Sequence, residues 1–257
     1  MKIATWNVNS VRIREPHVCR WLQRVEPDVL LLQEIKCEEK QFPAPAFKAL
    51  GYDSVVAGQK SYNGVAILSR IPLDVHHVTL PGLPPEDAQA RYLEIAAAGV
   101  TIGNLYLPNG NSGGEAGFAY KMAWMDRLAD RAQALLDSDT PFVLAGDYNV
   151  APADVDYATG TLPTDDALVR PETRARFRRM LWAGLTDAVR VTTPTGPIYT
   201  FWDYQGGAFQ RDRGLRIDHA LLSPVMADRL ISAAPDKNVR AEDQPSDHVP
   251  VLVTFED

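Results

Sequence analysis

The chain has 257 residues, of which 46% are hydrophobic and 23% charged, and this composition is typical of a folded protein with a large core. No apolar run approaches a membrane span, and the first expected strand starts at Lys2, so we expect neither an anchor nor a signal peptide. The net charge of −7 argues against a nucleic-acid partner, but only weakly, because binding depends on where the charge lies. Cys19 and Cys37, without zinc spacing, favour the reducing cytoplasm.

Strands alternate with helices in the first part of the chain, and paired strands come later. The expected strands, in chain order, cover residues 2–6, 28–33, 64–69, 91–97, 100–107, 142–145, 199–203, 215–223 and 251–255. The expected helices begin at Glu15-Pro16, Phe118 and Glu172, and Gly99 is expected to turn a hairpin. This mixture favours two stacked sheets flanked by helices over a single parallel sheet. With no repeat or linker, we expect one domain over residues 1–257.

Three features resemble ligand sites but lack the rest of the pattern. Asn109–Gly117 is Gly-rich and precedes a helix, but it has no Gly-Lys-Ser/Thr, so a nucleotide cradle is rejected. Asp154-Val-Asp156 lacks the remainder of an EF-hand. His76 and His77 fall in a polar loop or edge strand, where adjacent side chains point apart, and we expect them to be surface residues.

The most informative stretch is Pro141–Asn149. Its apolar run fits a strand buried on both faces, and Gly146 then ends the run. Asp147 and Asn149 follow, and period-2 geometry turns their side chains the same way. Gly, Asp and Asn are also turn formers, so this stretch alone leaves a turn and a site equally open.

The same pattern recurs at other strand ends. Polar side chains stand at or just past the end of an apolar run at Asn7, Glu34, Tyr106, Asp147, Asn149, Asp247 and His248, and Asp218 lies within a run. A helix-start carboxylate is the alternative for Glu34. Carboxylates, amides and a histidine on one rim of a sheet suit an oxygen-ligand metal such as Mg²⁺, whereas no cysteine or histidine cluster argues for zinc or copper.

Six motifs stand in a fixed order along the chain. They are Trp6-Asn7-Val8-Asn9, Leu32-Gln33-Glu34, Leu105-Tyr106-Leu107-Pro108, Gly146-Asp147-Tyr148-Asn149, Arg216-Ile217-Asp218 and Ser246-Asp247-His248. The set resembles the endonuclease/exonuclease/phosphatase superfamily, and within it the exonuclease III branch of apurinic/apyrimidinic endonucleases. The match runs from Lys2 to Phe255, so it covers nearly the whole chain. The resemblance implies a four-layer α/β sandwich, with two central mixed sheets and helices outside.

The resemblance also implies roles for single residues. It implies metal binding by Asn7, Glu34, Asp147, Asn149, Asp247 and His248, with Mg²⁺ as the ion and Mn²⁺ as a substitute. Asp147 would move a proton, Asn149 would orient the attacking water, and Tyr106 would contact the phosphate. His248, held by Asp218, would sit against the scissile phosphate. These residue types suit phosphodiester hydrolysis, because a His paired to a buried Asp has a fixed tautomer and stabilises negative charge when protonated.

An ion pair of Asp218 with Arg216 or Arg213 is the structural alternative for this carboxylate, and the Asp247-His248 motif disfavours it. Phe201, Trp202 and Leu215 align with the residues that line the pocket for a base-less sugar in the exonuclease III branch. One core residue and one exposed residue would be the ordinary outcome for Phe201-Trp202 in a strand.

The predicted substrate contacts are Asn9, Tyr106, Asn109, Phe201, Trp202, Arg213 and Leu215. Two Arg-rich stretches, Arg170–Arg179 and Arg211–Arg216, are expected to hold the DNA backbone, although a solvated helix face or loop is the alternative for each.

The sequence therefore predicts a Mg²⁺-dependent, monomeric endonuclease that cuts duplex DNA 5' to abasic sites, with 3'-5' exonuclease action and removal of blocked 3' ends. A phosphatase or phospholipase on the same scaffold is the rival within the class. A non-catalytic DNA-binding domain is the rival outside it, but it would need a broken site, and every expected polar position is filled.

Overall fold

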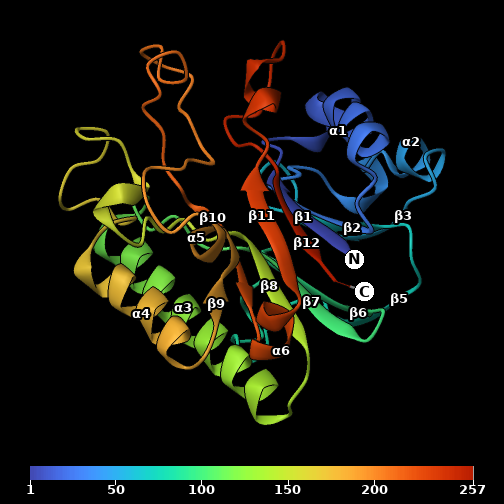
Figure 1. Cartoon of the computed structure of the whole chain (residues 1–257), viewed down its shortest axis with the longest axis horizontal. Helices are drawn as coiled ribbons and strands as arrows, with labels where there is room; N and C mark the ends of the chain where they lie inside the picture. Colours follow the sequence, from blue (N-terminus) through green and yellow to red (C-terminus); the bar gives the residue numbers. More distant parts are fainter. Residues whose placement is uncertain (257) are drawn as a thin grey trace.

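The computed structural model describes residues 1–256 and contains two six-stranded sheets packed face to face, with helices on the outer sides (Figure 1). Sheet A contains, in spatial order, β11 (Leu230–Pro235), β12 (Val251–Phe255), β1 (Lys2–Asn7), β2 (Val29–Gln33), β4 (Val65–Ser69) and β3 (Asp53–Ala57). Sheet B contains β5 (Leu73–His77), β6 (Tyr92–Ala97), β7 (Val100–Tyr106), β8 (Phe142–Asp147), β10 (Asp218–Leu222) and β9 (Thr186–Asp187).

The helices are α1 (Val11–Val25), α2 (Ala44–Lys48), α3 (Gly114–Asp137), α4 (Pro171–Trp182), α5 (Ala188–Thr192) and α6 (Pro224–Asp228), with short 3₁₀ turns at Glu39–Gln41, Asp154–Asp156 and Lys237–Ala241. Within residues 1–256, every helix is too short or too polar to span a bilayer. The prediction of one domain stays a prediction, and its last residue, Asp257, lies outside the described residues.

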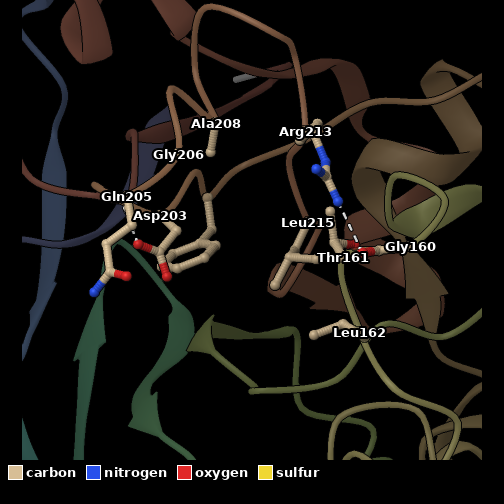
Figure 2. A pocket seen from close by; sticks show the side chains of 10 residues that line it. Gly160, Thr161, Leu162, Asp203, Gln205, Gly206, Ala208, Arg213 and Leu215 are labelled. Carbon is tan, nitrogen blue, oxygen red and sulfur yellow. Dashed lines mark hydrogen bonds between the residues drawn. The ribbon is translucent and has the colours of Figure 1, made fainter.

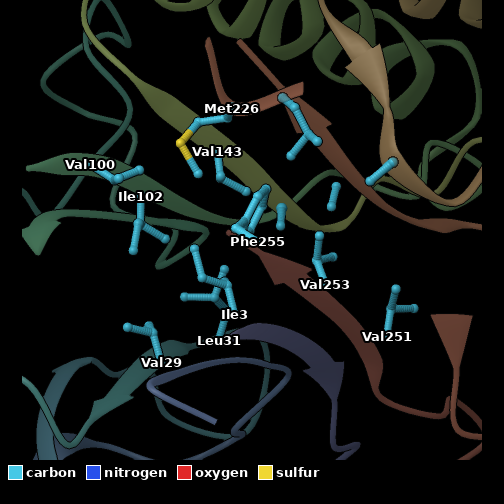
Figure 3. Close-up of a cluster of buried hydrophobic side chains, with 14 of the residues drawn as sticks. Ile3, Val29, Leu31, Val100, Ile102, Val143, Met226, Val251, Val253 and Phe255 are labelled. Carbon is cyan, nitrogen blue, oxygen red and sulfur yellow. The ribbon is translucent and has the colours of Figure 1, made fainter. Parts of the chain in front are cut away.

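The core has three layers because the central strands bury both faces. Leu31 and Val143 point between the two sheets, together with the side chains drawn in Figure 3. Their neighbours point outward: Leu30 packs in the cluster that holds α1, and Leu144 packs in the cluster that holds α3 and α4. Each fully buried aliphatic side chain of this kind contributes about 1.5–3 kcal/mol. The predicted four-layer sandwich and the buried strand before Asp147 are confirmed.

Two parallel strand pairs bring the polar strand ends to one edge. β1 pairs with β2 with Asn7 opposite Gln33, and β7 pairs with β8 with Tyr106 opposite Asp147. β10 runs antiparallel to β8 and starts at Asp218, directly opposite Asp147. Parallel strands end at the same side of a sheet, so the residues just past their ends share one rim.

The first helix differs from the prediction at its start. α1 begins at Val11, whose N–H donates to the Ile35 carbonyl 3.2 Å away, so Glu15-Pro16 lies in the second turn rather than the first. Pro16 is exposed, and water can reach the carbonyl that its missing N–H leaves without a partner. The helix ends before Pro27 as expected, at a left-handed Glu26.

Two expected strands are shorter or absent. Residues 199–203 form only isolated bridges, in which Phe201 pairs with Leu215 and His248. β10 begins at Asp218 instead of Leu215, because the Oγ1 of Thr200 accepts the N–H groups of Ile217 and Asp218 in place of a strand partner. Asp218 is therefore the first residue of its strand, not an interior one.

Some strands were not predicted, and a bulge changes one side-chain direction. The strands β3, β9 and β11 lie at or next to sheet edges and lack long apolar runs. The pairing of β5 with β6 shifts register between Val75 and His77, and both His76 and His77 come within 3.8 Å of Glu94. The two rings are surface residues as predicted, but they do not point apart.

Gly146 fits where no side chain can. A Cβ at this position would lie 1.9 Å from the Leu105 carbonyl oxygen of the neighbouring strand. We expect Gly146→Ala to lower the free energy of unfolding by about 3 kcal/mol or more, measured by urea denaturation. The control is Gly51→Ala, where φ is +86° but nothing lies within 4 Å, and the expected cost is about 1 kcal/mol. Equal losses in the two variants would contradict the close approach of β7 and β8.

Candidate active site

The end of β8 holds two of the predicted residues in fixed orientations. Asn149 adopts a left-handed conformation with φ +48°, and its N–H donates to Asp147 Oδ1 at 2.9 Å. Its side-chain Nδ2 donates to the Leu107 carbonyl at 2.9 Å, and its Oδ1 accepts from Asn109 Nδ2 at 2.9 Å. Asp147 and Asn149 are both buried. The stretch is therefore a turn and a polar cluster at once.

The amide of Asn7 joins the two sheets. Asn7 Nδ2 donates to Glu34 Oε1 at 2.8 Å and to Asp147 Oδ2 at 3.0 Å, while its Oδ1 accepts from the Asn9 N–H. Lys36 adds a charge, because its Nζ lies 2.8 Å from Glu34 Oε2. Burial alone would raise the pKa of Glu34, but Lys36 and Asn7 outweigh it and hold the pKa below its usual value.

His248 is held by a buried carboxylate. Its Nδ1 lies 2.8 Å from Asp218 Oδ2, and its Nε2 lies 3.8 Å from Asp147 Oδ2. Burial alone would lower the pKa of His248, but Asp218 and then Asp147 raise it to about 10. Burial raises the pKa of Asp147, and Asp218 and Glu34 add to the effect while His248 opposes it. The imidazolium is thus the stable form at neutral pH.

The alternative ion pair of Asp218 is absent from the described residues. Arg216 is buried and binds Asp156 at 2.7 Å and Asp187 at 2.6 Å, and Arg213 donates to the Gly160 carbonyl at 2.8 Å. Asp218 keeps one carboxylate oxygen without a hydrogen-bond partner. The carboxylate is therefore committed to His248, as the motif predicted.

The remaining polar residues surround this centre. The Tyr106 hydroxyl faces the carboxylates; burial raises its pKa well above the usual value, and Glu34 and Asp147 raise it further. Asn9 sits to one side, where its Nδ2 donates to Asp247 Oδ1 at 3.2 Å and its Oδ1 accepts from Lys36 at 2.6 Å. Hydrogen bonds connect Glu34 to Asp147 through Asn7 alone, whereas they connect Asp247 to Asp147 through Asn9 and Asn7.

Glu34, Asp147 and His248 offer ligand atoms within 4.8 Å of one another. Two carboxylates this close, with one oxygen each facing the same amide nitrogen, fit a divalent cation that prefers oxygen donors. The prediction that Asn7, Asn149 and Asp247 complete the ligand set stays a prediction. In the structure it is the amide nitrogen of Asn7, not its oxygen, that faces the two carboxylates.

A cavity of about 370 Å³, lined by both polar and apolar side chains, lies beside the centre. Figure 2 shows residues 203–208 on one side, and Gly160–Leu162 with Leu215 on the other. Phe201 connects the cavity to the centre, because its ring centroid lies 5.0 Å from that of His248. Arg213 donates a hydrogen bond to the Gly160 carbonyl at the edge of the cavity, on the side of Gly160–Leu162.

Trp202 does not line this cavity, contrary to the prediction. It is 1% exposed and packs against Ala208 and Val249, and its indole N–H donates to Asp212 at 3.1 Å. The alternation along residues 201–202 places Phe201 toward the cavity and Trp202 in the core, which is the ordinary outcome considered for this pair.

The Arg-rich stretches are less available than the sequence indicated. Arg216 is buried in its ion pairs, so it cannot contact DNA. In α4, Arg174 pairs with Asp154 and Arg176 pairs with Asp126. Surface ion pairs of this kind are weak and can exchange for phosphate, so these arginines remain candidates for DNA contact.

Two residues near the centre were missed. Lys36 stands two positions after Glu34, and its positive charge was the only feature of the sequence that could have indicated a place in the site. Lys121 is buried beneath Asn149 and donates to its carbonyl at 2.6 Å. Its signal was the helical period, since Phe118, Lys121 and Met125 lie on one face of α3.

We expect Asp218→Asn to lower the pKa of His248 from about 10 toward its ordinary value in metal-free protein, measured by NMR titration of the imidazole C–H. The pKa of His248 is higher in the folded protein than its unfolded value of about 6.5. The protonated imidazole therefore contributes its full stabilisation of the wild-type fold below about pH 6.5, and this contribution is lost as the pH rises toward about 10. The variant should lose this pH dependence. The ring of His219, which contacts Arg216, is the internal control, and an unchanged His248 titration would contradict the assignment.

The sequence and structure match known proteins over nearly their full length. The model of the Endonuclease/Exonuclease/phosphatase family matches residues 4–248. The chain is 34% identical to exodeoxyribonuclease III of Haemophilus influenzae, over 99% of this chain and 100% of that protein. A 3'-5' exonuclease of Neisseria meningitidis is 42% identical with a TM-score of 0.94, and an AP endonuclease of Archaeoglobus fulgidus is 35% identical with a TM-score of 0.94, each covering 100% of both chains. The chain therefore belongs to the endonuclease/exonuclease/phosphatase family, and it is a phosphodiester hydrolase of that family.

Proposed function

We propose that this protein is a DNA-repair nuclease that hydrolyses the phosphodiester 5' to abasic sites in duplex DNA and also removes nucleotides and blocking groups from 3' ends. The observation that carries the proposal is the convergence of Asp147, Asn149 and the Asp218–His248 pair beside a cavity that Phe201 and Leu215 line. The similar proteins support each part: one is an exodeoxyribonuclease III, one an AP endonuclease, and the Neisseria protein is a 3' phosphatase bound to a product DNA hairpin.

Asp147 and Asn149 act on the attacking water. Asp147 has a raised pKa, so its carboxylate can take up and release a proton near neutral pH. Asn149 cannot titrate, and its amide is oriented by Leu107 and Asn109, so it can hold the water in line with the scissile bond. The Asp147 carboxylate accepts the backbone N–H of Asn149, which places both residues within one turn of chain.

His248 and Tyr106 stabilise the phosphate. The imidazolium held by Asp218 carries a positive charge at neutral pH, and its Nε2 lies on the side of Asp147. From there it can stabilise the negative charge that develops on the phosphate during hydrolysis. The Tyr106 hydroxyl faces the same space and stays protonated, because its pKa is raised. A divalent cation held by Glu34 and Asp147, which we propose to be Mg²⁺ with Mn²⁺ as a substitute, would neutralise the phosphate oxygens when bound.

The cavity favours a sugar that has lost its base. Leu162, Phe201 and Leu215 offer apolar contact to a sugar ring, and Asp203, Gln205 and Arg213 stand around them with polar groups. An abasic sugar leaves the duplex stack at low cost, whereas an intact internal nucleotide must give up stacking and pairing. A nucleotide or blocking group at a 3' end is also free to enter. We propose that the protein acts as a monomer, in the cytoplasm, on duplex DNA.

A phosphatase or phospholipase on this scaffold would share the chemical centre but not this substrate. The assay that separates them offers the protein a duplex with one abasic analogue, a duplex with a 3'-phosphate, and a soluble phosphoester such as p-nitrophenyl phosphate, each with Mg²⁺ and with EDTA. We expect cleavage of both duplexes with Mg²⁺ and none with EDTA. Turnover of the soluble ester alone would replace the proposal with the phosphatase.

The single residues can be tested on the abasic duplex. We expect Asp147→Asn, Glu34→Ala and His248→Ala each to lower kcat by about 10²–10⁴-fold, because each removes a proton carrier or a charge at the reacting phosphate. Circular dichroism should show that the variants stay folded. Asp53→Asn, an exposed carboxylate on β3, is the matched control and should keep wild-type kcat. Full activity of a folded Asp147→Asn variant would remove Asp147 from the mechanism.

A further inference from the structure

Lys121 places a buried amino group in the third turn of α3, and burial lowers its pKa to about 7 although Asp147 and Asp166 raise it. Its side chain is 0% exposed. Within residues 1–256 its ammonium forms no ion pair with a carboxylate, and it donates instead to the backbone carbonyls of Asn109 at 3.0 Å, Asn149 at 2.6 Å and Ala167 at 3.2 Å. An ammonium has three N–H donors, so all three are used and the group has one orientation.

The three carbonyls belong to two connections. Asn109 lies between β7 and α3, whereas Asn149 and Ala167 lie near the two ends of the connection between β8 and α4, which the 3₁₀ turn at Asp154–Asp156 divides. Buried polar groups are costly unless their donors are satisfied, and here backbone oxygens from these loops are the acceptors. The loop at Gly110 lies close against the lysine stem, because a Cβ there would come within 2.7 Å of the Lys121 Cδ. Lys121 therefore ties these loops together directly beneath the active-site rim.

One of the tied residues is strained and lies in the active site. Asn149 has a φ of +48°, which a non-glycine residue adopts at a cost. Its carbonyl is bound by Lys121, its N–H by Asp147 and its side chain by Leu107 and Asn109. Asn109 is itself bound by Lys121 through its carbonyl. The ammonium thus contacts the backbone on both sides of the Asn109–Asn149 side-chain pair.

We propose that Lys121 is a positioning residue that fixes the amide of Asn149, and with it the attacking water, without contacting the substrate. The inference rests on the proposed function, in which Asn149 orients that water. Lys121→Met keeps an unbranched side chain that is one atom shorter and removes all three donors. Misplacement of a reacting group by about 1 Å can cost about 10²-fold in rate, so we expect kcat on the abasic duplex to fall by that order while KM changes by less than about threefold.

A double-mutant cycle separates positioning from general destabilisation. In an Asn149→Ala background, Lys121→Met should lower kcat by less than about twofold, because the group that it positions is gone. Arg131→Met on the same helix is the matched control, since Arg131 binds the buried Glu94 far from the Asn149 loop and its loss should leave kcat unchanged. Multiplying losses in the double variant, or wild-type kcat in a folded Lys121→Met protein, would overturn the proposal.

A spectroscopic measurement needs neither substrate nor metal. In metal-free protein, Lys121→Met should shift the side-chain amide NMR resonances of Asn149 and Asn109 and speed their hydrogen exchange, whereas Arg131→Met should not. If the wild-type protein cleaves no DNA, the proposed function fails, and unshifted amide resonances would separately refute the role of Lys121. Should Lys121→Met not fold, Lys121→Gln, which carries two N–H donors in place of three, should lower kcat by about tenfold. Wild-type kcat in that variant would overturn the inference.

Discussion

The amide nitrogen of Asn7 joins the two sheets at the active site. It donates to Glu34 at the end of β2 in sheet A and to Asp147 at the end of β8 in sheet B. The contact depends on the face-to-face packing of the sheets, which brings two rims of parallel strands together. The core between the sheets therefore sets the distance between the carboxylates, and a change in sheet packing would be felt directly at the site.

The electrostatics of the site are balanced by neighbouring groups rather than by solvent. Three carboxylates, Glu34, Asp147 and Asp218, face two cations, His248 and Lys36, which leaves one net negative charge when Asp147 is ionised. Burial makes this charge costly, and the raised pKa of Asp147 is the physical result. A bound divalent cation would remove the cost. Without a cation, the site therefore carries an electrostatic cost.

Much of this arrangement could be predicted from the sequence. Apolar runs predicted the buried strands, and polar residues just past their ends predicted Asn7, Glu34, Asp147 and Asn149 as neighbours, which the hydrogen bonds confirm. The pairing of His248 with Asp218 followed from motif resemblance, because no local pattern relates residues thirty positions apart in the chain. Side-chain direction at Phe201 and Trp202 could not be predicted, because it depends on bridges to Leu215 and His248 that are distant in sequence.

Other differences have a common cause in long-range contacts. Arg216 belongs to a basic stretch in sequence, yet in the fold it is enclosed by Asp156 of a 3₁₀ turn and Asp187 of β9. Lys121 interrupts an apolar helix face that the periodicity identified correctly, and its partners are carbonyls of the β7–α3 and β8–α4 connections. A charge on a buried face is therefore informative in itself, since it must find acceptors that the sequence does not show.

Chemistry and substrate choice are carried by different parts of the fold. The carboxylates and His248 stand on or beside strands whose positions the core fixes, whereas the cavity is walled by the two loops around residues 160–162 and 203–208. Rigid strand ends can keep a phosphate and its attacking water aligned to within fractions of an ångström. Loops tolerate substitution, so the walls of the cavity can change which sugar enters without disturbing the reacting groups. Phe201 connects the two parts, because it lines the cavity and packs against His248, and we expect this position to couple the shape of a bound sugar to the orientation of the imidazolium.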